Sequence, residues 1–389
     1  MKKTNVRRRD FIKVLGVGGT AVLLPSALSG CSDRELLGLS PWHGPRNDME
    51  LRLKIISYGI LAPNPHNKQP WKIQLKEGNK FDLFVDRGRL LPETDPFYRQ
   101  IHIGQGTFLE NIQIAAAHFG YHAKITYFPK GNYSNQAISH LPVVEVSLLK
   151  SSQTMDSSLF ESILKRQSNK SVYKKINIKQ DVFDKFSNCI NEMGITFSYS
   201  KDDKQLEVLH KIMSEGMTIE TGNHKRDMET IKMFRFNDQE VNKYRDGFGI
   251  AQTGKSGLVK KIVETLFLDR SSTEKDPSSF GKQAVTLTTD QANSASAYCW
   301  LLTDHNERID QVLVGQVYNR INLIATKLGL AMHPMSQVLQ EYKDMSHLQE
   351  KFLRELDIPK GKTVQMFFRL GKADPIEHSP RRKLKSLLV

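Results

Sequence analysis

Cysteine is scarce in this chain of 389 residues, which has only Cys31, Cys189 and Cys299. Their spacing does not fit a metal site, so a fold held together by a zinc ion bound to cysteines is excluded. Cys299 lies in an apolar run over residues 298–302 that predicts a buried strand, and Cys189 follows a predicted helix. A packed free thiol is the simplest expectation for both, and a disulfide between them is the alternative.

Several functional motifs are also missing. No Gly-x-Gly-x-x-Gly opens a helix after a strand, since Gly104-Gln105-Gly106 has no third glycine, and no Ser/His/Asp order is supported. His118 and His122 are separated by the helix-ending Gly120, so no metal is expected there. The net charge is +14, but it is spread along the chain and aromatic residues make up only 8%. Nucleic-acid binding is therefore not expected.

Residues 1–30 are expected to be an export signal. A charged stretch over 2–13 precedes an apolar stretch over 14–28, which is too short and too rich in Gly and Pro to span a bilayer comfortably. The segment that contains Arg8 and Arg9, Arg-Arg-Asp-Phe-Ile-Lys, resembles the twin-arginine signal, and a generic secretory signal is the alternative. Because the twin-arginine route exports folded proteins, it predicts a cofactor inserted before export.

Leu28-Ser29-Gly30-Cys31 resembles a lipobox, in which the Cys is lipidated and begins the mature protein. A plain cleavage site beside an unrelated Cys is the alternative. Lipidation of Cys31 would supply enough buried methylene groups for stable anchoring. We therefore expect a protein anchored to a membrane on its periplasmic face, with residues 31–47 as a polar tether.

Two modules are expected after the tether. The elements of the first module, residues 48–150, are a helix over 49–61, a hairpin of strands 71–75 and 81–85, a helix over 105–119, and strands over 124–128 and 143–148. Those of the second, residues 157–389, are helices near 163, 182, 206 and 228, strands over 297–303 and 363–370, and a helix over 310–328. A loop-rich lid over 237–280 contains one amphipathic helix over 258–268, and residues 379–385 form a basic tail.

The two modules contain an internal echo. Residues 106–120 and 315–329 share Gly, Ile, Ala and Gly at equal spacing: Gly106 with Gly315, Ile112 with Ile321, Ala116 with Ala325, and Gly120 with Gly329. Each stretch predicts a core helix that ends at a glycine. Together with a helix-then-strand order in both halves, the echo predicts a duplicated module, with chance similarity as the alternative.

The most informative stretch is the loop 62–71, Ala-Pro-Asn-Pro-His-Asn-Lys-Gln-Pro-Trp. Its prolines restrict φ and remove donors, so the loop is stiff. Asn64, His66, Asn67 and Gln69 present amide and imidazole groups just before a strand, which suits the edge of a flat heteroaromatic ring. An ordinary polar turn is the alternative from composition alone.

This loop resembles the nitroreductase superfamily, whose first helix is followed by Ala-Pro-Ser-x-x-Asn-x-Gln-Pro-Trp. The likeness continues in further segments that together cover most of the mature chain: Asp95–Gln100, Gly104–Ala116, Arg166–Tyr173, Gly329–Pro334, Arg369–Gly371 and Ser379–Arg382. An ordinary member has all of these in one subunit, and two subunits form two flavin sites. Here Arg166-x-Ser-x-Lys, the family's opening segment, occurs only in the second module, and the Asn/Gln/Pro/Trp loop only in the first.

The chain therefore resembles the fused-dimer, Acg-type subgroup, in which one polypeptide replaces the dimer. The resemblance implies an α+β fold: two mixed, largely antiparallel sheets flanked by helices and packed as an intramolecular pseudo-dimer. It also implies one FMN per chain and a monomer that acts as a pseudo-dimer.

The resemblance also assigns residues to the cofactor. Arg166, Ser168 and Lys170 would hold the phosphate and ribityl chain, with Arg381 or Arg382 as a second phosphate ligand, because a fork of donors fits a dianion. The loop residues Asn64, His66, Asn67 and Gln69 would approach the isoalloxazine ring. Its N5 and carbonyl edge would face Pro334, Met335, Ser336 and Gln337. The alternatives are solvated charges for Arg166 and Lys170, a disordered tail, and a plain core role for Met335.

These features predict an exported FMN-dependent oxidoreductase with an unknown acceptor, in which the flavin carries the redox chemistry and no catalytic acid or base can be named. The alternative is an FMN storage or sequestration protein. A lid over 237–280, hinged at Gly247, Gly249, Gly254 or Gly257, would exclude substrates if it stayed closed. Because NAD(P)H is not maintained outside the inner membrane, the electron donor is unknown: another donor, such as a quinol or a partner redox protein, is one expectation, and no turnover is the alternative.

Overall fold

The computed structural model describes residues 36–153, 156–190 and 194–389. The predicted export signal at Arg8 and Arg9 and the predicted lipidation site at Cys31 lie outside the described residues. None of the helices in the described part of the chain combines the length and the apolar character needed to cross a bilayer.

The first half of the chain forms a four-stranded antiparallel sheet in the order β1-β2-β4-β3. Alternate residues of its central strands are buried and share one hydrophobic core with two helices. The elements are α2 (Leu51–Gly59), β1 (Trp71–Lys76), β2 (Lys80–Val85), α3 (Arg99–His118), β3 (Tyr121–Tyr127) and β4 (Val144–Lys150).

The second half forms another four-stranded antiparallel sheet, in the order β5-β8-β10-β9. All seven residues of β8 are buried, because one face of the sheet packs on α5 and α12 and the other on α6 and α13. The predicted buried strand around Cys299 is thereby confirmed, and Cys189 and Cys299 are free thiols rather than a disulfide. The elements are α5 (Gln180–Asn188), β5 (Thr196–Ser200), α6 (Asp203–Thr221), β8 (Ala297–Thr303), α12 (Arg308–Lys327), β9 (Ala331–Pro334), α13 (Ser346–Glu355) and β10 (Thr363–Gly371).

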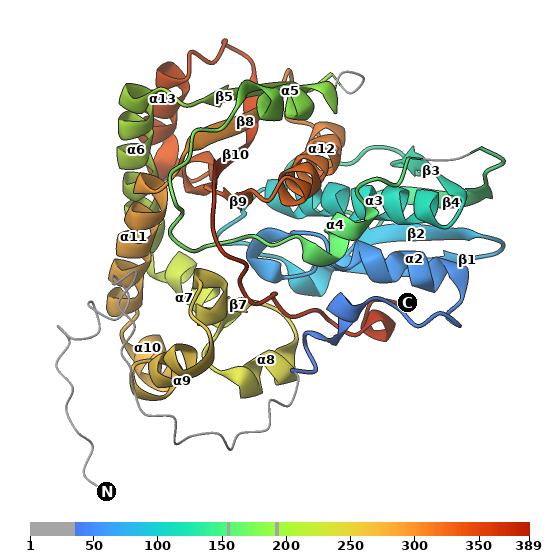
Figure 1. Ribbon diagram of the computed structural model, residues 1–389, viewed down its shortest axis with the longest axis horizontal. Helices are drawn as coiled ribbons and strands as arrows, with labels where there is room; N and C mark the ends of the chain where they lie inside the picture. The colour runs from blue at the N-terminus through green and yellow to red at the C-terminus, as the bar shows by residue number, and fades with distance from the viewer. Residues whose placement is uncertain (1–35, 154–155, 191–193) are drawn as a thin grey trace, which may run out of the picture.

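The helices α3 and α12 pack against each other between the two sheets (Figure 1). Across this contact Glu110 forms an ion pair with Arg320, and Asn319 donates a hydrogen bond to Asn111. In the frame of the internal echo, residue 110 is equivalent to 319 and residue 111 to 320. Exchanging the two halves therefore maps the position of the 110–320 contact onto that of the 319–111 contact, as in an isologous dimer interface. The predicted α+β fold with a pseudo-dimeric arrangement is confirmed.

Residues 237–280 differ from the expected loop-rich lid, because they are largely helical. Their helices are α8 (Asp238–Tyr244), α9 (Gly257–Leu266) and α10 (Arg270–Lys275), and the chain continues into α11 (Ser278–Asn293). Helices of six or seven residues contain too few apolar periods to be recognised from periodicity. Their caps are the visible signal instead: the side chains of Asn237 and Asp269 accept hydrogen bonds from backbone N–H groups in the first turns of α8 and α10.

The expected polar tether is wrong for the part of it that the structure describes, residues 36–47. Trp42, in the short helix η1 (Ser40–His43), is buried and donates a hydrogen bond from Nε1 to the carbonyl oxygen of Ser379 over 2.9 Å. Its ring stacks on His378 with 3.9 Å between centroids. The polar composition concealed the apolar surface of Leu39 and Trp42, which is enough to hold the segment against the C-terminal part of the chain.

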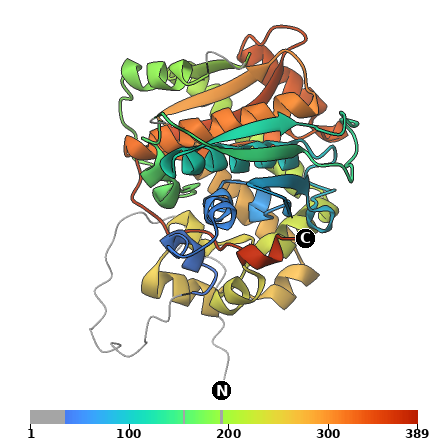
Figure 2. The ribbon, with the colours of Figure 1, turned by 90° about the vertical axis from the view of Figure 1, so that its right-hand side faces the viewer.

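The C-terminal tail is packed rather than disordered. After β10 the chain crosses back to the first half, and its end lies beside the strands there (Figures 1 and 2). Leu387 is fully buried, and Ile73 of β1 exchanges backbone hydrogen bonds with Leu387 and Val389 over 2.9 and 3.0 Å. The tail thus extends the first sheet and brings residues 373–381 past the junction of the two halves.

Candidate functional site

A cavity of about 1650 Å³ is walled by segments from both halves of the chain. The first half contributes the 63–67 loop and part of α3, and the second half contributes residues 166–172, the end of β9, α6 and α11. All predicted cofactor-binding residues except Gln69 and Arg382 line it: Asn64, His66, Asn67, Arg166, Ser168, Lys170, Pro334, Met335, Ser336, Gln337 and Arg381. Residues far apart in the sequence therefore meet at one site.

The 62–71 loop has a strained backbone. His66, Asn67 and Gln69 have φ values of 48°, 50° and 53°, a left-handed region that residues other than glycine seldom adopt. Asn64 supports this conformation, because its side-chain oxygen accepts a hydrogen bond from the backbone N–H of Gln69 over 2.7 Å. The result is a rigid turn that presents the His66 imidazole to the cavity.

The imidazole of His66 is neutral at physiological pH. Burial lowers the pKa of His66 to about 3, and the positive charges of Lys170 and Lys68 act in the same direction. Its Nδ1 atom is buried and has no hydrogen-bond partner among the described residues. A ring nitrogen without a partner in a cavity wall is available to a ligand.

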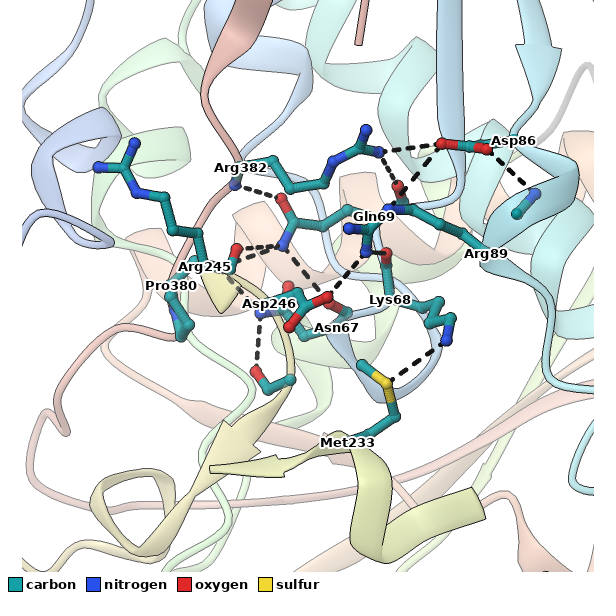
Figure 3. A network of polar contacts seen from close by, with 12 residues as sticks. Asn67, Lys68, Gln69, Asp86, Arg89, Met233, Arg245, Asp246, Pro380 and Arg382 are labelled. Atoms are coloured by element: carbon teal, nitrogen blue, oxygen red, sulfur yellow. Dashed lines mark hydrogen bonds and ion pairs between the residues drawn. The ribbon is translucent and has the colours of Figure 1, made fainter. Parts of the chain in front are cut away.

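Gln69 and Arg382 do not line the cavity but tie the tail to the loop (Figure 3). The Gln69 side chain accepts a hydrogen bond from the backbone N–H of Arg382 over 2.8 Å and donates one to the carbonyl oxygen of Arg245 over 2.9 Å. The Arg382 guanidinium donates to the Gln69 carbonyl oxygen over 2.9 Å and to Asp86 over 3.4 Å. These side chains are used by protein partners, which corrects the expectation that they contact the cofactor directly and leaves Arg381 as the predicted second phosphate ligand.

Asn67 lines the cavity, yet its amide is also occupied by protein groups. Its Nδ2 atom donates to the carbonyl oxygens of Gly247 and Pro380, both over 2.8 Å, and its Oδ1 atom accepts from Arg381 over 2.9 Å. Asn67 therefore joins the loop, the 247–255 segment and the tail at one point. Its described contacts support a positioning role rather than direct contact with the ring of a ligand.

Arg166 and Arg381 lie side by side in the cavity wall, because both donate to the carbonyl oxygen of Leu61, over 3.2 and 2.9 Å. They are 3% and 1% exposed, and the Nε atom of each has no partner. In the described part of the chain no carboxylate lies within ion-pair distance of either guanidinium. Burial lowers the pKa of Arg166 to about 10, and burial together with Arg166 lowers that of Arg381 well below its ordinary value. Two adjacent buried cations without an acidic partner form a site for an anion.

Arg166 and Arg381 together form a cationic pole of the cavity. Trp42 lies beside this pole, and the sequence analysis did not predict its role. The guanidinium carbons of Arg381 and Arg166 lie 4.7 and 5.9 Å from the centre of its ring, within reach of a cation–π contact. The backbone N–H of Arg381 also donates to the carbonyl oxygen of Gly38 over 2.8 Å. A tryptophan in a short polar segment is itself a signal, because Trp side chains are seldom left in solvent.

The 166–173 loop is held by Arg369 of β10, which is fully buried. The Arg369 guanidinium donates to the carbonyl oxygen of Ser171 over 2.7 Å and lies 3.7 Å from the Tyr173 ring centre. This anchoring presents Lys170 to the cavity, where its amino group lies 4.0 Å from the Phe248 ring centre. Burial lowers the pKa of Lys170 to about 8, so it is largely charged at neutral pH.

The residues 334–337 leave β9 along the cavity wall. The backbone N–H of Met335 donates to the carbonyl oxygen of Phe367 over 2.9 Å, which extends the pairing of the sheet by one residue. Met335 is 1% exposed and belongs to the core cluster of the second half, so it has a core role as well as a place at the cavity. Within the described residues, no group of three His, Cys, Asp or Glu side chains is arranged to hold a metal ion.

Comparison with known proteins connects the chain with nitroreductase-like sequences, although no protein-family model matches it. A Mycobacterium tuberculosis protein with the provisional name NAD(P)H nitroreductase is 22% identical over 353 residues, 88% of this chain and 92% of the relative. An uncharacterized protein of that organism is 24% identical over 338 residues, 84% of this chain and 89% of the relative. The M. tuberculosis protein acg, also provisionally named as an NAD(P)H nitroreductase, is 34% identical over 77 residues, 20% of this chain and 23% of acg.

Solved structures give a weaker likeness. The FMN- and NADPH-dependent nitroreductase NfnB from a Sphingopyxis strain aligns with 59% of this chain and 96% of its own, at 11% identity and a TM-score of 0.37. A Desulfitobacterium hafniense nitroreductase with bound FMN aligns with 60% of this chain and 97% of its own, at 14% identity and a TM-score of 0.32. Over most of its length, the chain is thus similar in sequence to a protein with the provisional name of a nitroreductase, at 22% identity.

Proposed function

We propose that this protein is an FMN-binding oxidoreductase of the nitroreductase type, with one FMN in the cavity. The observation that carries the proposal is the pair Arg166 and Arg381, two buried guanidiniums that share the Leu61 carbonyl and have no acidic partner in the described residues. A phosphate monoester is a dianion with several acceptor oxygens, and it would balance both positive charges. The terminal nitrogens of Arg381 already donate to protein oxygens, whereas the Nε atoms of Arg381 and Arg166 have no partner.

The remaining wall suits the rest of that cofactor. The Ser168 hydroxyl lies 3.4 Å from the Arg166 guanidinium, where it is available to the phosphate or the ribityl chain. His66 offers an orphaned buried nitrogen to a heteroaromatic edge. Asn64 also lines the cavity, but its amide bonds to the backbone of Gln69 and Ala62, which supports a positioning role. When bound, FMN would supply hydride and single-electron transfer, while these residues bind and orient it.

The storage alternative is not favoured by the cavity. Ligand pockets typically enclose about 300–1,000 Å³, and the cavity of about 1650 Å³ exceeds that range. Space beyond one cofactor is what a second, reacting molecule requires. The acceptor is expected to be a small organic molecule that enters this space.

The test is to purify the protein from its native host and to identify and count the bound cofactor. We expect FMN at one per chain, by mass spectrometry of the released cofactor and by absorbance. Photoreduction without oxygen, followed by titration with a nitroaromatic or a quinone, should reoxidise the flavin. Absence of flavin would refute the cofactor assignment, and a reduced flavin that no acceptor reoxidises would favour storage.

Export remains part of the proposal, on the strength of the motifs at Arg8, Arg9 and Cys31. Replacing both arginines with Lys should retain the protein in the cytoplasm, and Cys31→Ser should release a soluble form. Fractionation of cells that express the full chain measures both. Normal export of the double-Lys variant would refute the twin-arginine assignment.

A further inference from the structure

Two carboxylates line another part of the cavity wall, formed by α6 and by α7 (His224–Met233). Glu220 is 6% exposed and Asp227 is 4% exposed. No hydrogen bond or ion pair connects either carboxylate to another group in the described part of the chain. Unpaired buried carboxylates are costly, which points to a partner that the cavity receives from outside.

A third side chain, of a different type and from a different segment, supports this conclusion. Gln340, which follows η5 (Gln337–Leu339), is 5% exposed and lines the same cavity. Its side-chain amide has no hydrogen-bond partner among the described residues, although buried amides normally have one. The wall thus offers acceptor groups from three separate segments.

Two glycines set the positions of the carboxylates. A Cβ on Gly216 of α6 would lie 3.3 Å from the backbone nitrogen of Val338, so α6 runs close to η5. Glu220 follows one helical turn later on the same side of α6, next to the segment that carries Gln337 and Gln340. On α11, a Cβ on Gly281 would lie 3.0 Å from Asp227 Oδ2, so the absence of a side chain there makes room for the carboxylate.

The cations in this region are engaged elsewhere. Arg226 of α7 forms two hydrogen bonds of 2.8 Å with Asp344 and lies over the Tyr342 ring at 3.6 Å. Lys170 lies over Phe248 and forms no ion pair with either carboxylate. Neither cation therefore forms an ion pair with Glu220 or Asp227, although the charges of both act on Glu220 from a longer distance.

We propose that Glu220, Asp227 and Gln340 form an acidic subsite that binds the cationic group of an organic substrate, an ammonium or an amidinium. Such a group supplies several N–H donors and a positive charge, which match two carboxylates and an amide oxygen. The subsite rests on the proposed function in one respect: its ligand is the molecule that exchanges electrons with the flavin. The binding itself depends only on this wall.

Calorimetric titration of the purified full-length protein tests the subsite with two probes of the same shape. Benzamidine carries an amidinium, whereas benzamide is its neutral counterpart. We expect benzamidine to bind at least tenfold more tightly than benzamide, and Glu220→Gln or Asp227→Asn to remove that preference. Glu207→Gln is the matched control, because Glu207 is an exposed carboxylate on the same helix. Equal affinities for the two probes, or a preference that survives in both variants, would overturn the proposal.

The pH dependence adds a second measurement. Burial raises the pKa of Glu220 to about 7 and that of Asp227 to about 6, so both carboxylates lose charge as the pH falls. The charged groups that act on Glu220 are Arg226, Asp227, Lys170 and Glu229. Lys170, with a pKa of about 8, gains charge over the same range and repels a cation more strongly. Benzamidine affinity should therefore weaken from about pH 8 to about pH 5.5, and affinity that does not change would contradict the assignment.

Flavin content, measured in the same samples, separates this proposal from the proposed function. Glu220→Gln and Asp227→Asn should keep full flavin, since neither residue belongs to the cationic pole. Protein that lacks flavin but prefers benzamidine would refute the cofactor and retain the subsite. Protein that has full flavin but binds benzamidine and benzamide equally would support the cofactor and refute the subsite. The wild-type comparison of the two probes decides the matter even if a variant fails to fold.

Discussion

Gly106 and Gly315 lie against each other where α3 crosses α12: a Cβ added to Gly106 would come within 2.9 Å of the Gly315 Cα atom. The same added atom would lie 1.8 Å from the carbonyl oxygen of Val312, and a Cβ on Gly315 would lie 2.0 Å from that of Ile103. Only glycine permits this approach. Both helices also line the cavity, α3 through Ile103 and Gly104 and α12 through Tyr318, so their close approach brings these two parts of the wall together.

The first prediction concerns this crossing. Gly106→Ala should separate the helices and lower the free energy of unfolding by about 1–3 kcal/mol, the usual cost of overpacking a core, or by more because the clash is with backbone. Thermal denaturation followed by circular dichroism measures the change. Gly88→Ala is the control, since its added Cβ would meet only Asp86 Oδ1, at an ordinary 3.4 Å. Equal stabilities for the two variants would show that the helices separate without cost.

The second prediction concerns Arg166. Arg166→Met should weaken flavin binding by roughly ten- to a hundredfold, which corresponds to about 1.5–3 kcal/mol for one charge-assisted contact. The flavin-free protein should lose little stability, because the Arg166 side chain makes two long hydrogen bonds, of 3.2 and 3.4 Å, and a distant contact with the Trp42 ring, and it is repelled by Arg381. Flavin titration and thermal melts with and without FMN measure both effects. Arg354→Met, at an exposed position on α13, is the control, and full flavin occupancy in Arg166→Met would contradict the phosphate assignment.

The third prediction concerns Trp42. Trp42→Ala should weaken flavin binding although the residue lies far from Arg166 and Arg381 in sequence, because it removes the ring beside both guanidiniums and the hydrogen bond to Ser379. Limited proteolysis should also cleave the C-terminal tail faster. Leu37→Ala, in the same segment but 64% exposed, should change neither property. Unchanged flavin affinity in Trp42→Ala would show that residues 36–47 pack on the tail without contributing to flavin binding.

The fourth prediction concerns the electron donor and depends on the proposed export. The bound flavin should be reduced slowly by NADH and NADPH without oxygen, and faster by dithionite, because no nicotinamide pool is maintained where the protein is expected to work. Bleaching of the visible flavin band after rapid mixing measures the rates. The basic chain could dock an acidic redox partner or anionic headgroups, and such docking would weaken with salt. Fast, saturable reduction by micromolar nicotinamide would return the protein to the NAD(P)H-dependent class.

Sequence reasoning was most successful where a pattern is local. Turn residues between two strands located β1 and β2, a continuous apolar run located β8, and helical periodicity with a terminal glycine located α3 and α12. It missed the edge strands β5 and β9 of the second sheet. It also missed α11 and α13, which pack on the core of the second half. Short or half-exposed elements lack a strong period of their own, so tertiary packing decides them.

For the site, the sequence by itself determined which residue types are present and in which stiff or charged segments they occur. Only the tertiary structure decided which of them face the cavity: Arg381 does, whereas its neighbour Arg382 points to Asp86 and Gln69. Trp42, Glu220 and Gln340 were likewise assigned to the site only from the structure, because the groups around each of them include residues distant in sequence. Local preferences act over a few residues, but a cavity between two halves arises from contacts between segments hundreds of residues apart, which no local pattern encodes.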